Sequence, residues 1–273
     1  MASLPPIDVP PNATGAGAFD APAAAEPDSA RFEYLLRLGD DNLILGQRLG
    51  EWCGHGPVLE VDISLANLAL DQIGQATLLL NAAGECEGEG RDGDALAFKR
   101  DVLDFRNCLL VEQPNGDFAQ TIARQFLFST WQELLFGELA GSRDESIAGV
   151  AKKAVKEVAY HASFASDWVV RLGDGTEESR SRMVDGLGWM WRFTGELFGE
   201  DRKAGDRGFG IDLAALRPAW DARIDSVLAE AGLDRPAPHR PTGGGRDGHH
   251  SEHLGHLLAQ MQFLQRTYPD AVW

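Results

Sequence analysis

The sequence VLEVDISLANLALDQIGQATLLLNAA, residues 58–83, gives the strongest indication of the fold. It follows Pro57, contains no proline, and places leucine, isoleucine, valine and alanine on almost every side of a helix with 3.6 residues per turn. A helix that is apolar nearly all round is buried by neighbouring elements on several sides. The stretch therefore predicts a central helix in a helical protein.

Periodic segments on both sides predict the helices that pack around it. Before it, apolar residues recur at steps of three and four from Leu35 to Trp52, and residues 54–57 break the pattern. No alternating strand pattern and no internal repeat occurs. We predict an all-α, ferritin-like bundle of four long helices with additional helices at the C-terminal end. The later helices are expected at about 95–110, 118–140, 144–172, 177–199, 213–231 (with Pro218 as a candidate kink) and 250–267.

The N-terminal region differs from the rest of the chain. Residues 1–29 are rich in proline and alanine and have neither the basic nor the apolar segment of a secretory signal. Such a composition cannot bury enough apolar surface to fold. We predict a disordered tail over 1–29 and one helical domain over 30–273.

Charge and cysteine content exclude several functions. The 273 residues carry a net charge of -17, whereas binding nucleic acid or anionic lipid needs a basic surface. The three cysteines (Cys53, Cys86 and Cys108) are odd in number and form no CxxC pair, which argues against a disulfide framework or a structural zinc site. No apolar run reaches the ~20 residues of a membrane span. We expect a cytoplasmic protein without nucleic-acid or membrane partners.

Polar residues on the apolar helix faces carry the functional signal. Asp41, Asp71, Glu157 and His161 interrupt these faces on three of the long helices. A buried carboxylate is costly unless it is paired or bound to metal. A carboxylate-bridged di-iron site needs acids that converge from several helices, including a Glu-x-x-His on each of two of them. Asp41 and Asp71 stand thirty positions apart, which fits a helix–loop–helix pair that brings both to one level.

The di-iron pattern is nevertheless incomplete. No Glu-x-x-His occurs in the chain, His161 follows Glu157 by four residues, and the third-helix position falls near Ser129, which has no carboxylate. We expect a degenerate site without metal, in which the polar residues form a hydrogen-bond and salt-bridge network. A second interpretation is iron held by a reduced ligand set. The degenerate di-iron positions are Asp41, Asp71, Gly74, Ser129, Glu157, Tyr160 and His161.

Four strings resemble one family in combination, over about residues 32–273. They are LRLGDDNLILGQRLGEWCGHGP (36–57), DISLANLALDQIGQA (62–76), LLVEQPNGDFAQTIARQ (109–125) and SEHLGHLLAQMQFLQR (251–266). They are similar to the C subunits of phenylacetyl-CoA 1,2-epoxidases, the multicomponent oxygenases of aerobic phenylacetate catabolism. The incomplete di-iron pattern agrees with this resemblance and separates the chain from the catalytic subunits.

The resemblance implies a ferritin-like fold and a non-catalytic, structural and regulatory role, with no cofactor in this chain. It implies three partners: a catalytic A subunit that carries the di-iron centre, a small B subunit, and a reductase with FAD and iron–sulfur. The implied reaction takes phenylacetyl-CoA, dioxygen and NADPH to the ring epoxide. The alternatives are a catalytic ferritin-like iron oxygenase or oxidase with few ligands, and a free-standing helical adaptor.

A group of histidines near the start of the last expected helix is a further candidate. His249, His250, His253 and His256 stand at helical spacings of three and four, which metal sites use. Ser251 is a reasonable helix cap within the same segment. The histidines are candidates for contact with a partner protein or for adventitious metal binding.

Overall fold

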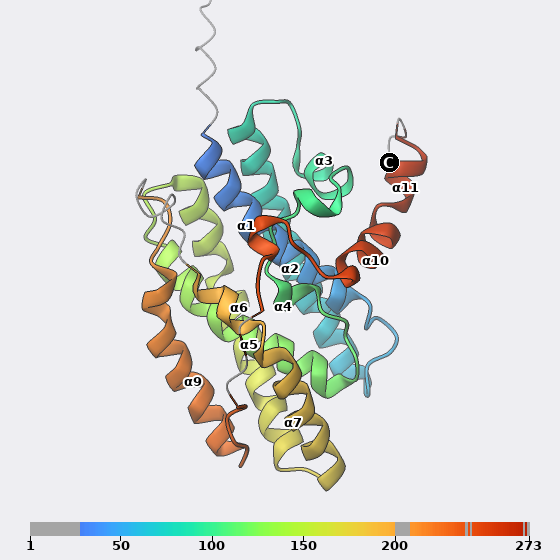
Figure 1. Cartoon of the computed structure of the whole chain (residues 1–273), viewed down its shortest axis with the longest axis vertical. Helices are drawn as coiled ribbons and strands as arrows, with labels where there is room; N and C mark the ends of the chain where they lie inside the picture. The colour runs from blue at the N-terminus through green and yellow to red at the C-terminus, as the bar shows by residue number, and fades with distance from the viewer. Residues whose placement is uncertain (1–27, 200–207, 238–239, 241, 270, 272–273) are drawn as a thin grey trace, which may run out of the picture.

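The computed structural model describes residues 28–199, 208–237, 240, 242–269 and 271 (Figure 1). Helices connected by turns and loops make up this part of the chain, and no strand occurs in it, so the predicted all-α class is confirmed. The four long helices are α1 (Ser29–Gly50), α2 (Leu59–Glu87), α5 (Phe118–Leu139) and α6 (Glu145–Gly173). The shorter α-helices are α3 (Gly93–Phe98), α4 (Leu109–Glu112), α7 (Glu177–Trp191), α9 (Arg217–Glu230), α10 (Glu252–Met261) and α11 (Phe263–Thr267). Short 3-10 helices are η1 (Val102–Asp104), η2 (Thr194–Phe198), η3 (Leu213–Leu216) and η4 (Gly245–Asp247).

Aspartates start three of the four long helices. The side chains of Asp28, Asp117 and Asp144 accept hydrogen bonds from the backbone N–H groups of the first turns of α1, α5 and α6. Each satisfies a donor that has no partner within the helix, and such a cap is worth about 1 kcal/mol. α2 has no such cap, and the burial of its apolar surface accounts for its stability.

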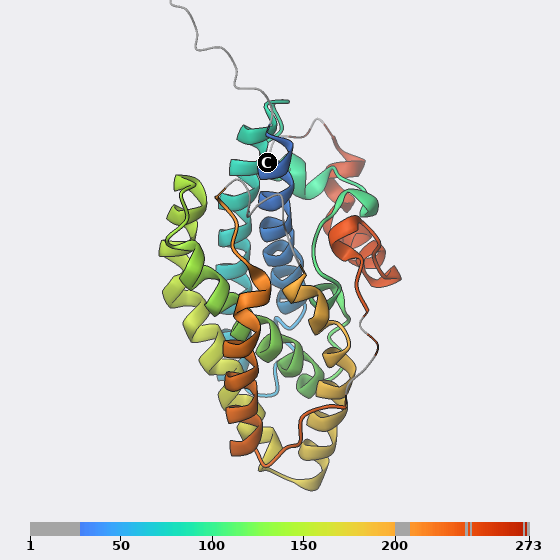
Figure 2. The same cartoon turned by 60° about the vertical axis from the view of Figure 1, so that its left-hand side comes forward.

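The long helices form a bundle in two pairs. α1 packs along α2 and α5 along α6, and contacts between α2 and α6 join the pairs (Figures 1 and 2). The interior between them is filled by leucine, alanine and aromatic side chains, among which Phe126, Phe128 and Trp131 of α5 are almost completely buried. α7 and α9 cover the outer side of the α5/α6 pair. α10 packs against η1, and the carbonyl oxygen of His253 in α10 accepts a hydrogen bond from Arg48 of α1.

Three expected segments differ in detail from the structure. Residues 95–110 are not one helix, because the backbone is extended at Asp101 and Phe105 (ψ 168° and 152°), which separates α3, η1 and α4. The helix expected at 177–199 ends at Trp191, and η2 follows it. Pro218 kinks nothing: it stands in the first turn of α9, where the missing N–H costs no hydrogen bond.

The expected disordered tail, residues 1–29, lies outside the described residues except for Asp28 and Ser29, which belong to the start of α1. Within the described residues, no helix combines the length and the apolar character that crossing a membrane requires.

Candidate functional site

Polar side chains from all four long helices meet at the centre of the bundle. They are Asn42 of α1, Gln72 and Gln75 of α2, Gln132 of α5 and His161 of α6, and none is more than 3% exposed. We call these five residues the central network. Their convergence matches the place where a ferritin-like bundle would hold its metal ligands.

Hydrogen bonds between amides join the helices across the central network. Gln132 Nε2 donates to Asn42 Oδ1 at 2.7 Å, and Gln72 Nε2 donates to Gln132 Oε1 at 2.8 Å. The chain of bonds ends on α1 itself, where Asn42 Nδ2 donates to the carbonyl oxygen of Leu38 at 2.7 Å. Because each amide both donates and accepts, the residues satisfy one another without any charged group between them.

The histidine of the central network links it to the surface. His161 Nε2 lies 3.0 Å from Asp71 Oδ2, and His161 Nδ1 lies 3.3 Å from Gln72 Nε2. Since the amide nitrogen of Gln72 can only donate, Nδ1 accepts, and the ring proton is on Nε2, where it is donated to Asp71. Gln75 Nε2 in turn donates to Glu157 Oε2 at 3.0 Å. Asp71 and Glu157 therefore bound the network where it opens into a groove between α2 and α6.

The interior positions differ from the expected ones by a small change of register. Five interior residues each follow an expected position by one residue. They are Asn42, Gln72, Gln75, Val158 and His161, which follow Asp41, Asp71, Gly74, Glu157 and Tyr160. Gln132, three residues after the expected position on α5, is the interior residue there.

Of the seven expected positions, His161 lies in the central network, and Asp71 and Glu157 bond to it at its edge. The other four positions lie elsewhere. Asp41 is buried against a different part of the chain, and the Asp71 side chain is 35% exposed at the edge of the network. Gly74 and Tyr160 are on the surface, whereas Ser129 is buried and donates to the carbonyl of Gln125 in its own helix. A one-residue shift turns a helical side chain by about 100°, which is enough to move it out of the interior.

The residues at the centre do not fit a carboxylate-bridged pair of irons. Amides or valine occupy the four positions that would supply carboxylates (Asn42, Gln72, Gln132 and Val158), and Gln75 stands where a histidine would. An amide has nearly the shape of a carboxylate, but it has no negative charge to offset a metal cation, and it turns an N–H donor toward the centre. Within the described part of the chain, no group of three or more histidine, cysteine or acidic side chains could hold a metal ion.

Two adjacent aspartates of α1, Asp40 and Asp41, take part in a second buried polar region outside the central network. Asp40 forms an ion pair with Arg100, whose NH1 lies 3.0 Å from Oδ2 and whose NH2 contacts Oδ1. Asp41 Oδ2 pairs with Arg246 at 2.6 Å, and its Oδ1 accepts from the backbone N–H of Cys108 at 2.8 Å. Burial raises the pKa of the Asp41 carboxyl, and the guanidinium of Arg246 opposes this rise.

Glu112 and Glu196 complete this region, which we call the ionic clamp. Glu112 accepts from His250 Nδ1 at 2.7 Å and from the backbone N–H of Ser251 at 2.7 Å. Glu196 accepts from the backbone N–H groups of residues 109, 244 and 246 at 2.8–3.1 Å. The ionic clamp comprises the pairs Asp40–Arg100, Asp41–Arg246 and Glu112–His250 together with Glu196, and it fixes residues 244–251 to α1 and to the segment 100–112.

Comparison with known proteins agrees with this architecture. Residues 19–273 match the family described as phenylacetic acid catabolic protein. The chain belongs to that family. The C subunit of the 1,2-phenylacetyl-CoA epoxidase of Escherichia coli (strain K12) is 49% identical over 243 residues, which cover 88% of this chain and 98% of that protein. The resemblance drawn from the sequence motifs is thus confirmed.

In this family member the expected histidine group does not form. The His250 side chain is fully buried between Glu112 and the carbonyl oxygen of Phe105, which Nε2 approaches to 3.0 Å. Both of its partners are acceptors, so both ring nitrogens donate and the imidazole is protonated. Burial alone lowers the pKa of this imidazole, but the hydrogen bonds to Glu112 and Phe105 raise it above its ordinary value. His249 and His256 are exposed, and no group of three or more possible metal ligands occurs among the described residues. Contact of these histidines with a partner protein stays a prediction.

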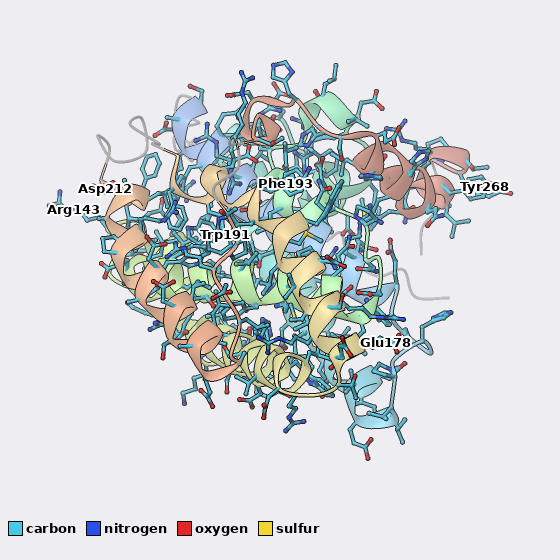
Figure 3. All side chains as sticks on the ribbon, turned by 60° about the horizontal axis from the view of Figure 1, so that its bottom comes forward. Arg143, Glu178, Trp191, Phe193, Asp212 and Tyr268 are labelled. Atoms are coloured by element: carbon cyan, nitrogen blue, oxygen red, sulfur yellow. The ribbon has the colours of Figure 1, made fainter. Side chains whose placement is uncertain are left out.

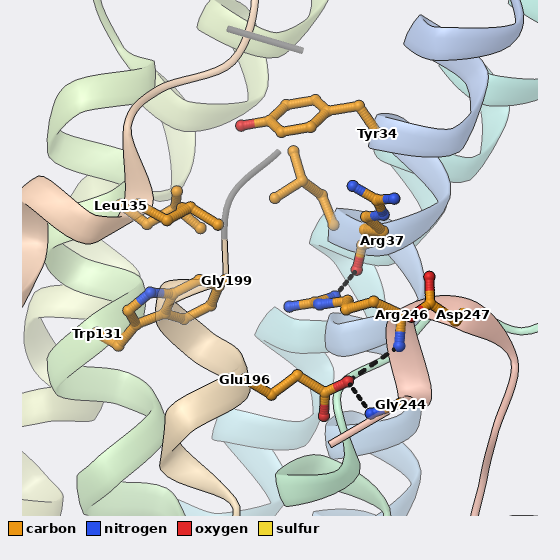
Figure 4. Close-up of a pocket in the computed structure, with 11 residues that line it drawn as sticks. Tyr34, Arg37, Trp131, Leu135, Glu196, Gly199, Gly244, Arg246 and Asp247 are labelled. Atoms are coloured by element: carbon orange, nitrogen blue, oxygen red, sulfur yellow. Dashed lines mark hydrogen bonds between the residues drawn. The ribbon is translucent and has the colours of Figure 1, made fainter. Parts of the chain in front are cut away.

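A cavity of about 250 Å³ lies beside the ionic clamp, between α1, α5 and the segments 196–199 and 244–247 (Figure 4). Tyr34, Leu38 and Trp131 line its apolar part. Its polar wall is already engaged: Glu196 accepts from two backbone N–H groups, and Arg246 NH1 donates to the carbonyl oxygen of Arg37 at 3.2 Å. The polar groups of this wall hold the chain together and leave little for a ligand to bind.

Proposed function

We propose that this chain is the structural and regulatory subunit of a phenylacetyl-CoA epoxidase. In this role it supports a separate catalytic A subunit, which carries the di-iron centre and forms the ring epoxide of phenylacetyl-CoA with dioxygen and NADPH. A small B subunit and a reductase with FAD and iron–sulfur complete the proposed complex in the cytoplasm. The similarity to the C subunit of the Escherichia coli epoxidase supports the family of the complex.

The observation that carries the non-catalytic role is the composition of the central network. Amides stand where a di-iron protein needs carboxylates, and they hydrogen-bond to one another at 2.7–2.8 Å. Such a network stabilises a ferritin-like bundle without any metal. The chain can then contribute by holding a neighbouring subunit in its productive geometry, which supports catalysis without chemistry of its own.

Iron analysis tests this proposal. The chain is expressed alone and together with the catalytic subunit, each with ferrous iron supplied, and iron is measured per protein. We expect no bound iron in the isolated chain and about two irons per heterodimer in the complex. Epoxide formation should require the catalytic subunit. The Gln132→Glu variant of this chain should form no epoxide when the catalytic subunit is absent.

One observation favours a second candidate function. Asp71, which bonds to His161, and Glu157 both line a groove that opens to solvent, although among the described residues the three side chains do not form a group that could hold a metal ion as they stand. Stoichiometric iron in the isolated chain that is lost in the Asp71→Ala or Glu157→Ala variant would overturn the non-catalytic role. The chain would then be an iron oxygenase or oxidase with few ligands.

A further inference from the structure

An uncovered apolar stripe runs along the outer side of α2. Leu59, Ile63, Leu70 and Leu78 are 71%, 50%, 66% and 39% exposed. Their spacings of four, seven and eight residues place them along one side of the helix, over about 28 Å. Isolated exposed leucines are common on protein surfaces, but a row of this length marks an interaction surface.

The stripe continues onto α6. A groove of about 110 Å³ between the two helices is lined by Leu70, Gly74 and Leu78 of α2 and by Val150 and Lys153 of α6 among others. Farther along α6, Tyr160 is 50% exposed and packs against Phe164, with ring centroids 6.2 Å apart. We call the combined surface of these apolar residues the α2/α6 face.

The charge beside the α2/α6 face is opposite to that of the whole chain. Three of the five lysines, Lys152, Lys153 and Lys156, are exposed on α6, although the net charge is -17. None of the three forms an ion pair with any described residue. Their ammonium groups remain available to carboxylates of another molecule, whereas the two carboxylates of the groove, Asp71 and Glu157, bond to His161 and Gln75 of the central network. The face therefore combines an apolar centre with a lysine edge on α6.

We propose that the α2/α6 face docks the catalytic di-iron subunit, which would present apolar helical residues edged with carboxylates. This inference rests on the proposed function and adds to it the surface and the chemistry of contact. Apolar side chains in the centre of such an interface contribute affinity, and the complementary charges at the edge contribute the rate and specificity of association.

A second copy of the chain fits this surface less well. A two-fold contact uses the same patch on both molecules, so it would bring two lysine clusters into one interface between two chains that each carry a charge of -17. Like charges at an interface disfavour binding. Charge complementarity therefore favours a different chain with an acidic surface.

Docking at this face would also close the central network from solvent. Asp71 and Glu157 line the same groove as Leu70 and Lys153, and both bond to residues of the network. A partner that covers the groove would remove water from this end of the network and strengthen the hydrogen bond between Asp71 and His161. The face thus connects partner binding to the polar interior of this protein.

Binding measurements on the full-length chain test the proposal. The dissociation constant for the purified catalytic subunit is measured for the wild type, for Leu70→Glu and for the double variant Lys153→Glu/Lys156→Glu. Phe263→Glu is the matched control, because Phe263 is an equally exposed apolar residue (61%) on α11. Figure 3 shows this C-terminal region extending to one side, with Tyr268 far from Asp212.

We expect Leu70→Glu to weaken binding about thirtyfold or more, as removal of a central interface anchor does. The double lysine variant should weaken binding about tenfold and reduce its dependence on salt. Phe263→Glu should stay within about twofold of the wild type, since it lies outside the face. The melting temperature of each isolated variant should match that of the wild type, because all the changed residues are exposed.

Three outcomes separate the possible failures. Wild-type affinity of both the Leu70→Glu and the lysine variants would overturn the docking surface and leave the proposed function standing, whatever the affinity of Phe263→Glu. No binding of the wild-type chain to the catalytic subunit would overturn both. A dimer of the chain alone that Leu70→Glu abolishes, measured by analytical ultracentrifugation, would assign the face to a second copy instead.

Discussion

The central network and the ionic clamp begin at adjacent residues of α1 and solve the burial of polar groups in two ways. Asn42 turns into the bundle and bonds to Gln132, whereas Asp41 turns outward to Arg246 and the backbone of Cys108. The network uses neutral amides around one histidine, and the clamp uses full charges. A buried acid in a ferritin-like chain is therefore not by itself a sign of a metal ligand.

The two regions also have different tasks. The central network joins helices that apolar packing already holds together, so its hydrogen bonds set the register of helices that would pack in any case. The ionic clamp holds residues 244–251, a segment with little regular structure, against α1 and the segment 100–112. Loss of a charged partner should therefore cost more in the clamp than loss of an amide in the network.

The largest effect is expected in the ionic clamp. The Asp40→Ala variant leaves the guanidinium of Arg100 buried without its carboxylate, since both side chains are at most 3% exposed. We expect the free energy of unfolding to fall by about 3–5 kcal/mol, measured by urea denaturation. The double variant Asp40→Leu/Arg100→Met removes both charges and should lose less than Asp40→Ala. An equal or larger loss in the double variant would contradict the assignment of the cost to the unpaired charge.

A charge placed in the central network should have the next largest effect. In Gln132→Glu a carboxylate would face Asn42 Oδ1, 2.7 Å from the present amide nitrogen, and the donor would be gone. We expect a loss of about 2–3 kcal/mol at pH 8. Burial should raise the pKa of the new carboxyl. The variant should therefore be most stable at low pH, where this carboxyl is protonated, and should lose stability as pH rises through the raised pKa.

The comparison variant for this position is Gln132→Met, which removes the polar group without adding a charge. This variant should also lose stability, because Asn42 and Gln72 lose their hydrogen-bond partner, but the size of the loss should not depend on pH. Denaturant unfolding of both variants from pH 5 to pH 8 measures the difference. A loss that is flat with pH in Gln132→Glu would mean that the centre admits water or a cation.

The pH dependence of the clamp should be smaller. The hydrogen bonds of His250 to Glu112 and to the carbonyl of Phe105 raise the pKa of its imidazole above the ordinary 6.5. This contribution to stability is complete below the unfolded pKa and is lost as pH rises through the raised pKa. We expect about 1–2 kcal/mol, the value of a charge-assisted hydrogen bond, to disappear across that window.

The measurement is the urea midpoint of the wild type and of His250→Gln as a function of pH. The wild type should become less stable above pH 6.5, and the variant should have lost that slope because glutamine does not titrate. A wild-type stability that rises over this range would contradict a protonated His250.

The smallest effect is expected at a carboxylate outside both regions. Asp117 caps α5, where its Oδ1 accepts from the backbone N–H of Gln120 at 2.9 Å, and its side chain is 39% exposed. Asp117→Ala should lower the free energy of unfolding by about 1 kcal/mol. A loss as large as that of Asp40→Ala would show that burial of the charge is not what distinguishes the ionic clamp.

Much of the fold was predictable because it depends on local patterns. Apolar residues at steps of three and four, with glycine or proline where the pattern ends, predict the long helices from the sequence alone. The incomplete di-iron pattern was also visible, since no Glu-x-x-His occurs anywhere. The break of the segment 95–110 into short helices could not be predicted from local patterns. It accompanies the ion pair of Arg100 with Asp40, which lies sixty residues earlier in the chain.

Residue types and short spacings are enough to predict the helical class, the family and the lack of a complete di-iron ligand set. They are not enough to predict that Asn42 and not Asp41 enters the bundle, or that Gln132 completes the network in place of Ser129. The reason is geometric. Neighbouring helical residues point about 100° apart, and several polar residues lie close together on each helix. Which of them becomes buried depends on how the helices pack against one another, and that packing involves residues far apart in the chain.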